Sequence, residues 1–571
     1  MDSLTFFIFF ALGIFLHFNQ VLSPQPALLL FTCFTLLLSP FPSHILYMLN
    51  RTRHLLPSAT ALLSRTAHKS LLKRTFGITN TLHTRYTHHY SKMTVETNLK
   101  PVFAKINDLK PNFVKRLGHA VSIPSVSGDE SLRPKVVKMG EFLESELKNL
   151  GADDVELKFM GEQPEPVTNK GLELPPVVVA HFGHDASKKT VLVYGHYDVQ
   201  PAFKEDGWDT EPFTLVQKGD RLIGRGSTDD KGPVIGWLDV LEAHKEAGIA
   251  LPVNIVTCFE GMEESGSIGL DKLIHEEADK AFKGVDVVCI CDNYWLGTRK
   301  PVLTYGLRGV NYYQMTIEGP SADLHSGIFG GIVHEPMTDL VKLMSQLVDG
   351  DGKILIPGID EMVAPVTQKE SQLYDDIDYD TAELAKSTGA ADISIYSDKK
   401  DILMHRWRYP SLSLHGIEGA FSGVGEKTVI PAKVSGKFSI RTVPNIASSK
   451  LTELVSAYCT EKFAELHSPN KFSVQLMHDG DYWLSDPFNK AFSAAKKATN
   501  LVWGVDPDFI RDGGSIPITL TFEKELNTNA VLLPMGRGDD GAHSINEKLN
   551  MDNYIGGVKT MTAYLHYLGG Q

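Results

Sequence analysis

The sequence predicts an α/β fold in which a discontinuous domain, built on a mainly parallel sheet flanked by helices, is interrupted by an inserted α+β domain. Over residues 105–310, and again after residue 480, short apolar runs typical of buried strands alternate with stretches of helical periodicity. Polar residues directly follow several of these strands. About 250 residues separate the last two polar motifs, which is far more than a loop holds and requires a second domain between them.

The first segment contains its elements in a regular order. Helical spacing of Val136, Met139, Leu143, Leu147 and Leu150, followed by Gly151 as a C-cap, predicts a helix. The later elements are a strand over 191–195, a glycine-rich loop over 224–232, a helix over 234–246, and strands over 253–259 and 285–291. Because strands and helices alternate, we expect a mainly parallel sheet whose carboxyl edge collects the polar motifs.

The inserted domain has its own pattern. Strands are predicted over 311–318 and 433–443, and a helix over 334–347 whose apolar stripe is more typical of a core or dimer surface than of a chemical site. In the second of these strands, Arg441 falls on the polar face of the alternation. The predicted organisation is an N-terminal extension, two parts of one domain and an insertion between them, with boundaries at 1–92, 93–310, 311–480 and 481–571.

Five polar motifs carry the chemistry, and several of them come at or just after a predicted strand. A His or Asp at a strand end is more often an ordinary loop residue. Acidic residues before a helix often do no more than interact favourably with the helix dipole. Adjacent acids such as Asp229 and Asp230 repel each other unless a cation or helix N-terminus absorbs their charge, and the loop lacks phosphate-binding spacing. The candidates are His196 with Asp198, Asp229 with Asp230, Glu260 with Glu263 and Glu264, Asp292, and Asp539 with His543.

Together these residues supply two imidazoles and several carboxylates, with no cysteine required. Such hard and borderline ligands suit a pair of divalent ions such as Zn²⁺ or Mn²⁺ bridged by one carboxylate. Of two neighbouring glutamates, one can bind a metal while the other stays free to carry a proton.

The motifs closely resemble those of the M20 family of dinuclear metallopeptidases, and within it the cytosolic non-specific and Cys-Gly dipeptidases. The resemblance covers about residues 95–571 and contains no departure at a catalytic position. The segments that carry it are GHYDVQP, GRGSTDDKGP, EGMEESGS, CDNYW, DLHSGIFGG, HRWRYPSLSLHGIEGAF and GGSIPITLTF.

The resemblance implies a role for each residue. His196 and Asp292 would bind one ion, Glu264 and His543 the other, and Asp229 would bridge them. Glu263 would be the general base and Asp198 would support His196 from behind, while the peptide bond after Asp229 would be cis. Substrate would be bound by His325 from the neighbouring subunit of a homodimer, by Arg441 as a carboxylate clamp, and by Thr428, His478 and Ser515; from sequence alone, His325 is an ordinary loop histidine.

The implied activity is hydrolysis of dipeptides, including Cys-Gly from glutathione turnover, with two Zn²⁺ or Mn²⁺ ions per subunit. Three alternatives stay open: a related amide hydrolase such as an aminoacylase or carboxypeptidase, a catalytically inactive scaffold relative, and a membrane-anchored interaction protein.

Charge and cysteine content limit the partners and the compartment. The first 92 residues carry a net charge of +7 and the remainder −20, too acidic for a nucleic-acid binder. Five cysteines are too few for a disulfide scaffold and fit a reducing, cytoplasmic compartment. Cys289 and Cys291 are expected to be buried core thiols rather than a redox or metal pair.

The N-terminal extension combines two apolar runs, 5–18 and 27–39, with a basic stretch that is rich in Ser and Thr. Each run is shorter than a comfortable membrane span, and the basic stretch resembles a mitochondrial presequence. A membrane anchor, a targeting segment, or sequence upstream of a start at Met93 are the three interpretations, and the last is favoured. Mitochondrial or membrane association is expected only if the extension is retained.

Overall fold

The computed structural model describes residues 95–163, 172–388, 390 and 394–570. The interpretations placed on the N-terminal extension lie outside these residues. Within the described part, none of the helices combines the length and the apolar character needed to cross a bilayer.

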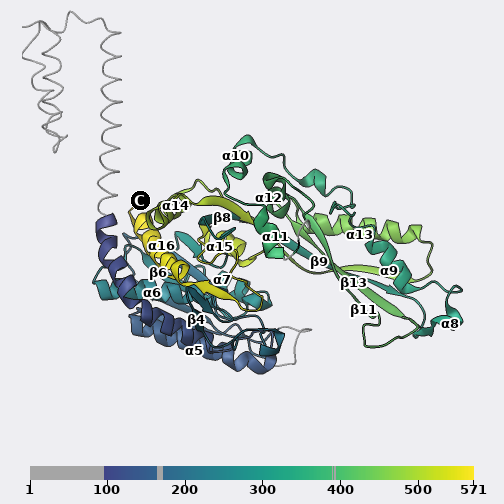
Figure 1. The fold of residues 1–571 in the computed structure, drawn as a ribbon, viewed down its shortest axis with the longest axis horizontal. Coiled ribbons are helices and arrows are strands. Elements are labelled where there is room, and N and C mark those ends of the chain that lie inside the picture. Colours follow the sequence, from purple (N-terminus) through teal and green to yellow (C-terminus); the bar gives the residue numbers. More distant parts are fainter. Residues whose placement is uncertain (1–94, 164–171, 389, 391–393, 571) are drawn as a thin grey trace, which may run out of the picture. The chain divides into compact units, whose positions relative to one another are not determined.

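A nine-stranded sheet forms the centre of the larger core (Figure 1). Its middle strands β6, β3, β7 and β17 run parallel, while the pairings at its two sides are mostly antiparallel. This arrangement confirms the predicted mainly parallel sheet. In spatial order the strands are β1 (Asp154–Lys158), β2 (Val177–Phe182), β6 (Asn254–Glu260), β3 (Thr190–His196), β7 (Val287–Ile290), β17 (Asn529–Leu532), β8 (Val302–Leu307) and β15 (Trp483–Leu484), with β16 (Asp508–Asp512) parallel to β8.

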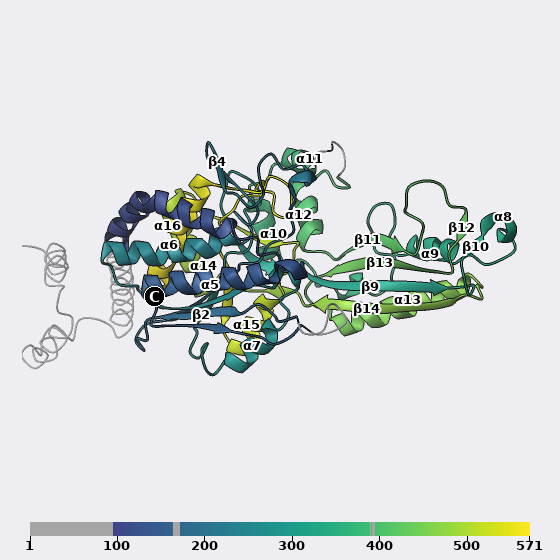
Figure 2. The same cartoon turned by 90° about the horizontal axis from the view of Figure 1, so that it is seen from below.

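Helices pack on both faces of this sheet (Figure 2). Five of these helices are one over residues 95–121, α5 (Arg133–Leu150), α6 (Lys231–Ala247), α14 (Lys490–Trp503) and α16 (Met551–Gly569). Two others, α7 (Leu270–Glu277) and α15 (Ile518–Leu526), pack against each other. Helix α5 confirms its sequence prediction, because Gly151 ends it in the left-handed conformation with φ at 96°. The predicted stripe of α5 is buried up to Leu147.

A four-stranded antiparallel sheet forms a second core. Its order is β11 (Ser411–Glu418), β13 (Lys433–Thr442), β9 (Gly309–Glu318) and β14 (Lys471–Gly480), and it packs against α9 (Pro336–Met344) and α13 (Ser448–Glu465). Leu340, Met344 and Leu347 of the predicted stripe are buried in this core, whereas Val341 is exposed. This sheet with its helices matches the α+β character expected of the insertion.

Residues between α9 and β11 do not all belong to this second core. Helices α10 (Gln368–Asp376) and α12 (Lys399–Trp407) pack on β16, and their Tyr374, Leu403 and Trp407 share a small core with Trp295 and Ile510. The domain boundaries at 310/311 and 480/481 therefore remain a prediction.

The remaining elements are short. They are α8 (Ser326–Phe329), α11 (Ala382–Thr388), the ribbon of β10 (Leu324–His325) with β12 (Val429–Ile430), the small sheet of β4 (Val216–Lys218), β5 (Arg221–Ile223) and β18 (Lys548–Asn550), and 3-10 turns at Glu130–Leu132, Lys204–Asp206, Glu263–Ser265 and Asp360–Met362. The described cysteines 258, 289, 291 and 459 are free and buried. This confirms Cys289 and Cys291 as core thiols.

Candidate metal centre and substrate residues

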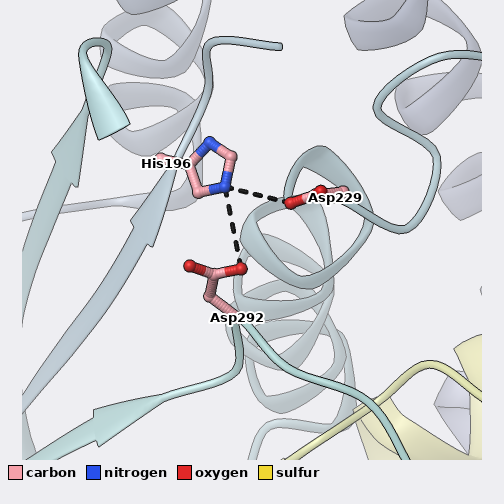
Figure 3. Close-up of side chains that lie close together, drawn as sticks. All are labelled: His196, Asp229 and Asp292. Atoms are coloured by element: carbon pink, nitrogen blue, oxygen red, sulfur yellow. Dashed lines mark hydrogen bonds and ion pairs between the residues drawn. The ribbon is translucent and has the colours of Figure 1, made fainter. Parts of the chain in front are cut away.

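The carboxyl edge of the parallel strands collects the predicted ligands. His196 is the last residue of β3 and Asp292 follows β7 by two residues, while Asp229 precedes α6. Because β3 and β7 are parallel neighbours, their ends lie at the same edge, and Figure 3 shows the three side chains converging there. The peptide bond between Asp229 and Asp230 is cis, as expected.

Two triads of ligand atoms share Asp229. His196 Nε2 lies 3.2 Å from Asp229 Oδ1 and 3.7 Å from Asp292 Oδ1. On the other side, His543 Nε2 lies 3.1 Å from Asp229 Oδ2 and 3.1 Å from Glu264 Oε2. Asp229 therefore presents one carboxylate oxygen to each triad.

His196 is held in one tautomer by Asp198. Its Nδ1 lies 3.1 Å from the carbonyl oxygen of Asp198 and 3.4 Å from that residue's Oδ1, so Nδ1 carries the hydrogen and Nε2 is left to face the triad. The Asp198 carboxylate also accepts hydrogen bonds from the backbone N–H groups of Glu263 and Glu264, at 3.2 and 3.1 Å. One buried acid thus fixes both an imidazole and the turn that carries the glutamates.

The charges of this cluster depend on each other. Hydrogen bonds to Asp229 and Glu264 raise the pKa of His543 to about 10, and Asp292 with the other acids raises the pKa of His196 although burial opposes it. Burial also raises the pKa of Glu263, and His196 counters this only in part. The carboxylates thus attract positive charge strongly, in the form of a proton or of a cation.

The donor set fits divalent cations. The ligand atoms of each triad, His196–Asp229–Asp292 and Asp229–Glu264–His543, lie within 4.8 Å of one another. Imidazole nitrogens and carboxylate oxygens, with no thiolate among them, match the preferences of ions such as Zn²⁺ and Mn²⁺.

Sequence reasoning missed Glu547, which holds the loop that carries Asp229. Its fully buried carboxylate accepts hydrogen bonds from the backbone N–H groups of Gly226, Thr228 and Asp229 at 3.0–3.1 Å, and from Arg225 Nη1 at 2.7 Å. Its only sequence signal is its position four residues after His543. Gln200 was also missed, although it lies in the GHYDVQP motif, and its side chain donates to Glu264 Oε2 at 2.7 Å.

The predicted substrate residues fall into separate groups. Arg441 of β13 donates from Nη1 to Ser515 Oγ at 2.9 Å. His478 of β14 is exposed and stacks on Tyr312, with ring centroids 5.4 Å apart.

His325 and Thr428 lie together at the exposed ribbon of β10 and β12, where Ser326 N donates to the Thr428 carbonyl oxygen at 3.2 Å. Among the described residues, no hydrogen bond or ion pair joins either side chain to the metal-ligand cluster.

Comparisons with known proteins agree with this geometry. Residues 192–567 match the model of peptidase family M20/M25/M40. The chain is 67% identical over 473 residues to the Cys-Gly metallodipeptidase DUG1 of Candida albicans, covering 82% of this chain and 97% of that protein. It is 43% identical to the human Beta-Ala-His dipeptidase, covering 82% and 92% of the two chains.

A solved structure of the di-peptidase Dug1p from Saccharomyces cerevisiae superimposes with a TM-score of 0.78 at 63% identity, covering 83% of this chain and 99% of the other. The family model, the full-length relatives and the ligand cluster point the same way. The chain therefore belongs to peptidase family M20/M25/M40 and is a metal-dependent peptide hydrolase.

Proposed function

We propose that this protein hydrolyses dipeptides, including Cys-Gly, the dipeptide released in glutathione degradation. The observation that carries the proposal is the pair of triads that share Asp229. The high identity to relatives named as dipeptidases over nearly their whole length supports dipeptides over N-acyl amino acids as substrates.

Two divalent cations, Zn²⁺ or Mn²⁺, would be held by the five ligands. His196 and Asp292 would bind one, Glu264 and His543 the other, and Asp229 both. Bound there, the cations would polarise the scissile carbonyl and promote ionisation of the attacking water.

Glu263 acts as the general base. It follows β6 at the same edge of the sheet, and its backbone is fixed by Asp198 Oδ1. Because burial raises the pKa of its carboxyl group, Glu263 can accept the proton of the attacking water and then deliver it to the leaving amine.

The substrate ends and the oxyanion are recognised by the remaining residues. Arg441 clamps the terminal carboxylate, assisted by Ser515 and His478, whereas Thr428, which lies on the same ribbon as His325, contacts the substrate together with that histidine. His325 is supplied by the second subunit of a homodimer and donates to the tetrahedral oxyanion. The exposure of His325 and of its apolar neighbours Ile328 (66%) and Ile332 (75%) supports a subunit contact at this ribbon.

We place the enzyme in the cytoplasm, because the described cysteines carry no disulfide and fit a reducing compartment. The N-terminal extension, if retained, directs it to mitochondria or membranes instead.

A panel of dipeptides, tetrapeptides and N-acyl amino acids tests the reaction, with Zn²⁺ or Mn²⁺ added back to metal-free protein. Wild type should cleave dipeptides fastest, whereas Glu263→Gln should lose at least about 100-fold in kcat and still bind the metal. The exposed Glu276→Gln on α7 is the matched control and should behave as wild type. Full activity in Glu263→Gln would remove the general base, and equal cleavage of tetrapeptides would contradict recognition of both ends.

Mixed dimers test the contribution of the second subunit. His325→Ala and Glu263→Gln are each expected to be inactive alone. When they are denatured together and refolded, about one quarter of the wild-type activity should return, because half of the dimers are mixed and each of these has one complete site. No recovery in dimers shown to be mixed would contradict the proposal.

A further inference from the structure

Two arginines meet where the two large sheets join. Arg308 is the single residue between β8 of the nine-stranded sheet and β9 of the four-stranded sheet, and Arg441 lies on β13. Ser515 connects them: its Oγ accepts from Arg441 Nη1 at 2.9 Å and donates to the carbonyl oxygen of Arg308 at 2.5 Å.

Among the residues that the structure describes, neither guanidinium has a carboxylate partner. Arg308 donates from Nε to the Gly513 carbonyl oxygen at 3.2 Å and from Nη1 to Ser411 Oγ at 2.9 Å, both neutral acceptors. Its Nη2 donates to no acceptor within the described ranges, and no acid of those ranges comes within 4.0 Å of either arginine. Asp512 lies close enough to act through its charge, but its Oδ1 accepts from the Gly514 N–H at 3.1 Å.

Two like charges in a partly desolvated place are costly. Burial, and the nearby charge of Arg441, lower the pKa of Arg308 to about 10, and burial also lowers the pKa of Arg441. Elsewhere in the chain the buried Arg225 and Arg408 are each paired with a glutamate at 2.7 Å. An unpaired couple of guanidinium groups is therefore an arrangement that an anion stabilises.

We propose that Arg308 is a second recognition residue for the substrate's terminal carboxylate, which it binds together with Arg441. This inference rests on the proposed function, in which Arg441 faces that carboxylate. A planar carboxylate has two oxygens and accepts from two guanidinium groups at once, and here it fills the place of the missing acid. The result is selection for peptides with a free α-carboxylate over peptides in which that charge is absent.

Paired substrates separate this role from a structural one. Arg308 also joins the 512–515 loop to the start of β11, so its removal can loosen the junction and slow every substrate alike. Cys-Gly and its C-terminal amide differ only in the charge that Arg308 is proposed to read. The quantity to measure is the ratio of kcat/KM for the acid to kcat/KM for the amide, in the metal-loaded enzyme.

Arg308→Gln should lower kcat/KM for Cys-Gly roughly 10- to 100-fold while changing the amide by less than about threefold, so that the ratio collapses. Arg441→Gln should do the same. Arg299→Gln is the matched control, because Arg299 is exposed and paired with Glu383 at 2.9 Å, and it should leave the ratio unchanged. Equal losses for acid and amide in Arg308→Gln would overturn the proposal and leave Arg308 a structural residue.

Calorimetric binding gives a second readout that does not need turnover. In the Glu263→Gln background, adding Arg308→Gln should weaken binding of Cys-Gly by the same factor and leave binding of the amide unchanged. If wild type hydrolyses no dipeptide, the proposed function fails, yet this titration still decides whether Arg308 reads the carboxylate. Equal affinities of Glu263→Gln and of the double variant with Arg308→Gln for Cys-Gly would refute the proposed role of Arg308.

Discussion

Lowering the pH from 7 to 4 should weaken the fold through two stacked histidines, His244 of α6 and His566 of α16. Their rings lie 5.3 Å apart with an interplanar angle of 11°, and the two Nε2 atoms are 3.1 Å apart. His244 Nδ1 donates to the Val240 carbonyl oxygen at 2.8 Å, so its Nε2 accepts the hydrogen of His566 Nε2. This arrangement requires both rings to be neutral.

The size of the effect follows from the pKa of His566. Burial and the neighbouring His244 lower it from an ordinary 6.5 to about 4. The unfolded chain binds a proton near pH 6.5 and the folded chain does not until about pH 4, so the stabilisation is complete above pH 6.5 and is lost as the pH falls toward 4. A pKa of about 4 in the folded chain, against 6.5 in the unfolded chain, corresponds to a difference of about 3 kcal/mol in the free energy of unfolding.

The assay compares wild type with His566→Gln by denaturant unfolding between pH 7.5 and 4, with metal present. Titrations common to both proteins cancel in the difference of unfolding free energies, which should shrink by about 3 kcal/mol as the pH falls. This free energy corresponds to a change of about 3 °C in melting temperature. The reason is that the entropy of unfolding of some 480 residues that unfold together is about 1 kcal/mol/K. The exposed His275→Gln should follow wild type, and a parallel pair of curves for His566→Gln would refute the reasoning.

Three further predictions concern buried contacts. In Glu547→Gln an NH2 donor replaces one of the two carboxylate oxygens that accept hydrogen bonds from the ligand loop, which should cost about 2–4 kcal/mol and weaken metal binding, measured by denaturation and metal titration. Gly261→Ala would place a Cβ 2.5–2.9 Å from three atoms of the buried Tyr197 side chain and should destabilise the protein by about 1–3 kcal/mol; an unchanged denaturation midpoint would contradict this. Arg116→Met leaves buried Asp239 without its partner at 2.5 Å and should cost about 3–5 kcal/mol at pH 8. Because burial raises the pKa of Asp239 to about 7, this loss should shrink as the pH falls below 7, and a pH-independent loss would argue against it.

The main sheet and the ligand-bearing edge could be predicted because their signals are local. A buried strand such as β3 is visible as an apolar run, and its end fixes where His196 must lie once the neighbouring strands are parallel. The same logic places Asp292 after β7. The bridging position of Asp229 came only from the family resemblance, since nothing in the spacing of residues 224–232 orients its two oxygens.

The supporting contacts could not be predicted because they join residues far apart in the chain. Glu547 is more than 300 residues from the loop that it holds, and a single buried glutamate in a polar segment has no periodicity to reveal it. In the sequence Arg308 is one more charged residue between two strands, and only the fold brings the 512–515 loop beside it. The packing of α10 and α12 on β16 could not be predicted either, because an amphipathic pattern does not show which sheet a helix covers.

Strand β17 is synthesised long after the two strands between which it lies. It lies between β7 and β8, although about 240 residues separate the end of β7 from its own start. At 5–20 residues per second, the ribosome needs on the order of 10–50 s to bridge that interval, and meanwhile both neighbouring strands have an open, apolar edge. We therefore expect the nascent chain to rely on chaperones over this interval, and substitutions in β17 to lower the yield of folded enzyme more than its stability once folded.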